Sequence, residues 1–162
     1  MAHITAKNAY KSLEERINKF PQGAPPSKTL YQILSILFTE EEARLVAKLP
    51  IKAFRLKTAA NIWNVSQSEA YKILDNLAKK ALILDLEDNK GKKYILPPPM
   101  AGFFEFSMMR TRQDIDQKLL AELYYQYINE EEDFIKELFY STDTKLGRVY
   151  VQEEVLTNEN EV

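Results

Sequence analysis

The chain has 162 residues, of which 45% are hydrophobic and 28% are charged, and its formal net charge is −2. This balance is typical of one globular domain, or of a small domain with extensions, and it excludes an intrinsically disordered chain. The longest apolar runs are short, as in residues 81–84, which excludes a membrane-spanning helix.

Cysteine is absent, so this chain can form neither disulfides nor thiolate metal sites. The N-terminal residues show no signal peptide, and we therefore expect a cytoplasmic protein. Charge is distributed unevenly, because residues 52–93 hold nine Lys/Arg against five Asp/Glu, whereas residues 94–162 hold six against fourteen. A moderately basic module is thus joined to an acidic segment.

The first part of the chain is expected to be helical. Residues 5–20 place apolar side chains at spacings of three and four, which predicts an amphipathic helix. The sequence PQGAPP ends this helix, and Ser27 is expected to cap the next one. Thr39 and Glu42 then predict a capping box at the start of a third helix.

Residues 58–80 predict a helix-turn-helix. Asn64 occupies the turn, where the backbone is often left-handed and where Asn is tolerated next best after Gly. Ser66 and Glu69 predict a second capping box, which starts the second helix at about Gln67.

Residues 81–96 change from helical periodicity to strand alternation and contain the turn sequence DNKG. They predict a two-stranded hairpin, the wing of a winged helix. The alternation is expected to place five apolar side chains on one face, namely Leu82, Leu84, Leu86, Tyr94 and Leu96.

Residues 100–110 are dense in aromatic and methionine side chains. We expect about half of this segment to pack in the core and the rest to contact another chain or domain, because it would otherwise expose a large apolar patch. The candidate interface residues are Phe103, Phe104, Phe106, Met108 and Met109. A long amphipathic helix is expected from Thr111 to about Tyr140.

The expected fold is mostly α: a winged helix-turn-helix with a small β-hairpin wing, an N-terminal helix and a long C-terminal helix. Four regions are expected: an N-terminal helical extension (1–27), a winged-helix domain (28–96), an apolar segment with a long helix for dimer or interdomain contact (97–140), and a C-terminal strand or linker toward a missing domain (141–162).

The exposed face of the 67–80 helix is a candidate DNA-reading surface. The candidate DNA contacts on this helix and the wing are Gln67, Ser68, Lys72, Lys79, Lys90, Lys92 and Lys93. Upstream, Lys52, Arg55 and Lys57 are candidate phosphate contacts. Two features oppose DNA binding: the face has no Arg, which makes the commonest guanine contact, and Asp75 lies in its middle. The alternative interpretation is that these lysines are simply solvated.

Catalysis and metal binding have no support in the sequence. The single histidine is His3, cysteine is absent, and only four glycines are present, without a phosphate-binding loop. The carboxylate runs 40–42 and 130–133 are expected to be solvated helix faces, and no ligand set with metal spacing is visible. We therefore expect no catalytic residue and no metal site in this chain.

Four segments of the chain carry a family resemblance: LFTEEEARLVAKLP at 37–50, the helix-turn-helix, KKYILPPPMAGFFEFSMMR at 92–110 and the helix that follows. Together they resemble the N-terminal region of ferredoxin-like iron–sulfur proteins of anaerobic prokaryotes. That resemblance implies a winged-helix-like module preceding a portion with cysteine-rich [4Fe–4S] motifs. The chain departs from this pattern in having no cysteine, so no cluster ligand can be assigned to any of its residues.

Three functions follow as expectations. The first is a non-catalytic winged-helix module of an iron–sulfur protein, whose partner is its own missing C-terminal domain, a redox protein or duplex DNA. The second is a homodimeric winged-helix transcriptional regulator that binds duplex DNA, because residues 58–96 are also similar to small bacterial repressors. The third is a subunit of a redox enzyme whose chemistry lies outside this chain.

Overall fold

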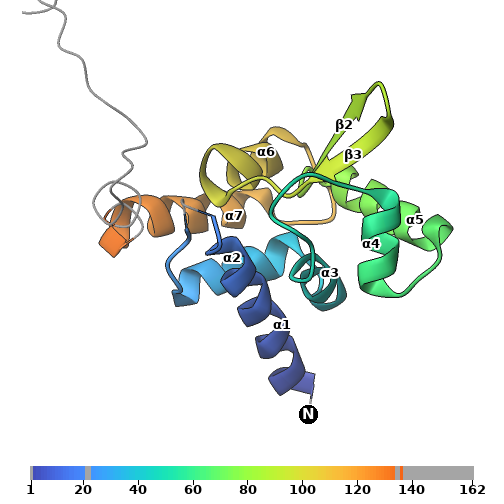
Figure 1. Ribbon diagram of the computed structural model, residues 1–162. Helices are drawn as coiled ribbons and strands as arrows, with labels where there is room; N and C mark the ends of the chain where they lie inside the picture. The colour runs from blue at the N-terminus through green and yellow to red at the C-terminus, as the bar shows by residue number, and fades with distance from the viewer. Residues whose placement is uncertain (1, 21–22, 134–135, 137–162) are drawn as a thin grey trace, which may run out of the picture.

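A computed structural model describes residues 2–20, 23–133 and 136. Over these residues the protein is mostly helical, as predicted, and carries a small three-stranded antiparallel sheet (Figure 1). The elements in chain order are α1 (Ala2–Ile17), α2 (Lys28–Leu37), α3 (Glu40–Val46), β1 (Phe54–Arg55), α4 (Leu56–Trp63), α5 (Gln67–Lys79), β2 (Leu84–Asp88), β3 (Gly91–Ile95), the π-helical turn η1 (Pro99–Phe103), α6 (Phe104–Met109), α7 (Gln117–Tyr125) and the π-helical turn η2 (Gln126–Glu130).

The starts of α2 and α3 confirm the capping predictions. Ser27 Oγ accepts a hydrogen bond from Leu30 N at 3.1 Å. At α3, Glu42 N donates to Thr39 Oγ1 at 3.2 Å, and Thr39 N donates to Glu42 Oε2 at 3.0 Å. The capping box of α3 is therefore complete, and it satisfies two of the backbone donors that a helix start leaves open.

The junction between α4 and α5 follows the predicted turn. Asn64 is left-handed, with φ 55° and ψ 47°, and Val65 N donates to Ala60 O at 3.1 Å, which together close α4 in a Schellman motif. Ser66 Oγ accepts from Glu69 N at 3.1 Å, so α5 starts at Gln67 as predicted. The second capping box is only half formed, because the Glu69 carboxylate makes no hydrogen bond to any described residue.

The sheet has the strand order β1-β3-β2. Its register pairs Asp85 with Tyr94 and Leu86 with Lys93. The predicted common face of Leu84, Leu86 and Tyr94 is therefore wrong, since directly opposed residues share a face. The cause is the turn, in which Asn89 and Lys90 are the loop and Asp88 pairs with Gly91 at φ 94°. A turn of this length sets which residues oppose each other, and a shift of one residue exchanges the two faces.

One cluster of buried apolar side chains runs through helices from α1 to η2. Phe38 belongs to this cluster, with its ring 6.1 Å from that of Phe103, and the Phe103 ring lies 4.9 Å from that of Phe104. Both Phe103 and Phe104 are buried, so they are core residues. The expected contact surface is thereby reduced to Phe106, Met108 and Met109, of which Met109 is 77% exposed.

The expected long helix of residues 111–140 is wrong at its start and is interrupted. Helix α7 begins at Gln117, because Asp116 Oδ1 accepts from Leu119 N at 3.0 Å and caps it there. The helical path passes through η2 and breaks at Glu131, which has φ −85° and ψ 95°. This break lies within the carboxylate run 130–133, where like charges at helical spacing oppose a continuous helix.

The predicted strand or linker at residues 141–162 lies outside the described residues. Within the part of the chain that the structure describes, no helix combines the length and the apolar character needed to cross a membrane.

Candidate nucleic-acid interface

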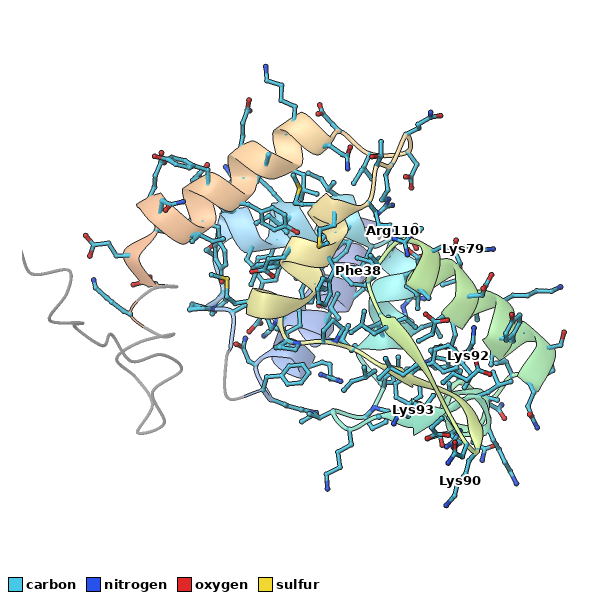
Figure 2. The ribbon with its side chains drawn as sticks, turned by 90° about the horizontal axis from the view of Figure 1, so that it is seen from above. Phe38, Lys79, Lys90, Lys92, Lys93 and Arg110 are labelled. Carbon is cyan, nitrogen blue, oxygen red and sulfur yellow. The ribbon has the colours of Figure 1, made fainter. Side chains whose placement is uncertain are left out.

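The candidate DNA contacts lie on α5 and on the β2–β3 hairpin. Gln67, Ser68 and Lys72 are exposed in the first turns of α5, and Lys79 is exposed in its last turn. The other three belong to the hairpin, with Lys90 in its turn and Lys92 and Lys93 on β3. Figure 2 shows Lys90 at the outer end of the hairpin, away from Lys79 on α5.

Three of the five candidate lysines form ion pairs with nearby carboxylates. Lys79 Nζ lies 2.7 Å from Asp75 Oδ2, one helical turn away. Lys92 Nζ lies 2.8 Å from Asp85 Oδ2, and Lys93 Nζ lies 3.7 Å from Asp88 Oδ2. Hydrogen bonds to these carboxylates raise the pKa of Lys79 and of Lys92 above the usual lysine value. A phosphate that binds either lysine must therefore compete with a carboxylate already in place.

Arg55 holds the hairpin turn through the two terminal nitrogens of its guanidinium. Its Nη1 donates to the carbonyl oxygens of Lys90, Gly91 and Lys92, at 3.0, 2.9 and 3.3 Å. Its Nη2 donates to both carboxylate oxygens of Asp88, at 2.8 and 2.9 Å. This hydrogen bonding holds the pKa of Asp88 below its usual value. These five hydrogen bonds engage Nη1 and Nη2, so a phosphate that binds Arg55 must compete with them for a side chain that is 37% exposed.

Lys72 and Lys90 form no ion pair with any residue that the structure describes. Lys72 shares a shallow pocket of about 330 Å³ between α3 and α5 with the carboxylates of Glu41 and Glu69. Residues 67–95 as a whole hold six lysines against five Asp and Glu residues. The face that the sequence proposes for DNA is thus of mixed charge, close to neutral.

Glu42 has a role beyond the cap that the sequence predicts. Its Oε1 accepts from Lys80 Nζ at 2.7 Å and from Asn76 Nδ2 at 2.9 Å, and the residue is only 8% exposed. Helices α3 and α5 are therefore joined by a largely buried ion pair. The capping motif marks Glu42 as important, but nothing in the sequence pairs it with Lys80, 38 positions away.

Trp63 is a core residue and not a platform for base stacking. It is 7% exposed, and its Nε1 donates to Leu45 O at 2.9 Å. Tyr71 on α5 is 45% exposed and lies within electrostatic range of Lys92 on the hairpin. Among the described residues of α5 and the hairpin, Tyr71 is thus the exposed aromatic side chain.

Among the described residues, no group of three or more His, Asp or Glu side chains could hold a metal ion. The [4Fe–4S] cluster implied by the family resemblance needs thiolate ligands, and the chain has no cysteine. The residues present do not fit that cluster, and we assign no ligand to it.

No family model, no curated protein and no solved structure matches this chain.

Proposed function

We propose that this chain is a non-catalytic winged-helix module whose main partner is a protein. Two observations support the winged-helix assignment. The elements run helix, strand, helix, helix, strand, strand from α3 to β3, and the first strand pairs with the last to give the order β1-β3-β2. In this assignment α4 and α5 are the helix-turn-helix and the β2–β3 hairpin is the wing.

The choice of a protein partner rests on the neutralised cations of α5 and the wing. Duplex DNA is bound mainly through its phosphates, and a DNA-binding module usually presents a clearly basic face. Here the ion pairs of Lys79, Lys92 and Lys93 and the hydrogen bonds of Arg55 engage four of the eight expected cationic contacts internally. The other four form no ion pair with a described residue, namely Lys52, Lys57, Lys72 and Lys90. A protein surface of mixed charge is the better complement to such a face.

The family resemblance extends this proposal to an iron–sulfur protein, in which the cluster lies outside this chain. The partner is then the cluster-bearing portion of the same protein or a redox protein. The coding sequence that follows Val162 tests this extension directly. Clustered Cys-x-x-Cys spacings support it, and a stop codon at that point contradicts it.

A second candidate is a homodimeric transcriptional regulator that binds duplex DNA. The observation that favours it is the N-terminal end of α5, where Gln67, Ser68 and Lys72 are exposed, as in helices that enter the major groove. Lys90, at the outer end of the hairpin, is a further cation that forms no ion pair with a described residue.

A duplex-DNA titration separates the two functions. We expect the wild-type protein to bind a fluorescent random duplex weakly at low salt. We expect Asp75→Asn/Asp85→Asn to bind it about tenfold more tightly, because Lys79 and Lys92 are then free to contact phosphates. The matched control is Glu122→Gln/Glu130→Gln, which removes two exposed carboxylates from α7 and η2 and should change the affinity less.

The opposite result supports the regulator. Wild-type binding that is tight at physiological salt, falls steeply as salt rises and is lost in Lys72→Gln/Lys90→Gln contradicts the protein-binding proposal.

A further inference from the structure

Strand β2 is an edge strand of the sheet. In the order β1-β3-β2 it pairs with β3 on one side, and no described strand pairs with it on the other. Residues 85–88 are exposed, and Figure 1 shows the hairpin projecting beyond the helices. Such an edge presents unpaired backbone donors and acceptors, which form a template for one more strand.

Strand β2 lacks two of the features that usually block an edge. Natural edge strands are often protected by proline, by a bulge or by charged side chains, and the sequence of β2, LDLED, has no proline but carries three carboxylates. The register with β3 is regular from Leu84 to Asp88, without a bulge. Five residues are enough to pair with a short extended peptide, the arrangement known as β-augmentation.

The charge of β2 determines which strand fits beside it. Asp85, Glu87 and Asp88 are exposed, and Glu87 forms no ion pair with any described residue. A second copy of β2 would bring the same carboxylates together, and like charges on neighbouring strands destabilise pairing. A strand with Lys or Arg at alternate positions would place positive charges beside Asp85 and Glu87, which share one face of the sheet. Asp88 lies on the other face and is already paired with Arg55 and Lys93.

Strand β3 shows that β2 accepts a basic neighbour. Its sequence, GKKYI, carries Lys92 and Lys93, and both lysines reach carboxylates of β2 across the ladder. An incoming strand of similar composition on the open side of β2 would find Glu87 without a competing described cation.

We propose that the open edge of β2 binds an extended basic segment of a protein partner as a fourth strand. This inference rests on the proposed protein-binding function and names the surface and the chemistry of the partner. The main-chain hydrogen bonds give the affinity, and the carboxylates select lysine or arginine.

The test uses the full chain and three short synthetic peptides. The first alternates lysine with valine, the second alternates glutamate with valine, and the third is the lysine peptide with alternate backbone nitrogens methylated. We expect the lysine peptide to bind and to slow amide hydrogen exchange at residues 84–88. The methylated peptide keeps every positive charge but loses the donors of one edge, so we expect it not to bind.

Charge reversal in the protein provides the matched pair of variants. Glu87→Lys should weaken binding of the lysine peptide about fivefold or more, because an opposite-charge neighbour becomes a like-charge one. Glu122→Lys makes the same change on α7, where the glutamate is also exposed, and should leave the affinity nearly unchanged. Both sites are on the surface, and thermal unfolding checks that both variants fold.

Several outcomes overturn the inference: no binding of the lysine peptide, equal binding of its methylated form, unchanged exchange at 84–88, or equal weakening by the two reversals. A concentration-dependent dimer that protects 84–88 without peptide overturns it in favour of a second copy. If DNA binding is also weak, these outcomes overturn only the strand-binding inference, and the proposed protein-binding function still holds. Tight, salt-sensitive binding of the random duplex ends the proposed function whatever the peptides do.

Discussion

Helices α3 and α5 start with the same sequence pattern, a hydroxyl residue followed three positions later by glutamate, yet the two glutamates behave differently. Glu42 turns back to Thr39 N and also binds Lys80 and Asn76, at 8% exposure. Glu69 remains exposed, and only its backbone N–H takes part in the cap, as donor to Ser66 Oγ. The motif thus identifies a helix start, while burial decides whether its carboxylate stabilises the fold.

The largest expected effect comes from Glu42. Glu42→Ala leaves Lys80 in a largely buried position without its carboxylate and frees the N–H of Thr39, so we expect it to lower the free energy of unfolding by about 3 kcal/mol. Chemical denaturation measures this value. Glu40→Ala, which removes an exposed ion pair with Arg44 on the same helix, is the control and should cost less than about 0.5 kcal/mol. Equal losses for the two variants would show that Glu42 is no more than a surface residue.

An intermediate effect is expected at Ser66. Ser66→Ala removes the acceptor for Glu69 N at the start of α5 and should lower the free energy of unfolding by about 1 kcal/mol. Ser66→Asp restores an acceptor at the same position and should recover most of the loss. If Ser66→Ala and Ser66→Asp have nearly the same free energy of unfolding, α5 does not need this cap.

The smallest effect is expected at Glu69. Because its carboxylate bonds to no described residue, Glu69→Ala should change the free energy of unfolding by less than about 0.5 kcal/mol, through the helix dipole alone. The same denaturation series measures it beside Glu42→Ala. A loss near that of Glu42→Ala would show that the second capping box closes in solution.

Local features of this fold could be predicted from the sequence because they depend on a few neighbouring residues. Three helices start at a hydroxyl side chain that accepts a hydrogen bond from the backbone N–H three positions later, at Ser27, Thr39 and Ser66. Asn64 takes up the left-handed turn for which few residue types are suited. The left-handed residue after α5 is Ala81, at φ 58°, and no local preference predicts it.

Features that depend on tertiary contacts could not be predicted. The guanidinium of Arg55 meets Asp88 across 33 positions, and Lys80 meets Glu42 across 38. The faces of the hairpin depend on its register, which the turn sets and which alternation alone leaves open. For this reason the sequence indicated a basic wing, whereas in the folded chain most of its cations already have partners.

Trp63 gives this molecule a built-in optical reporter. It is the single tryptophan of the chain, it is nearly buried, and its indole N–H is bonded to Leu45 O between α3 and α4. Its fluorescence therefore comes from one position in the core, without a second indole to obscure the signal. Emission that shifts to longer wavelength records the separation of α3 from α4, while a ligand confined to the hairpin edge should leave it unchanged. Unfolding and surface binding can thus be followed separately in one unlabelled sample.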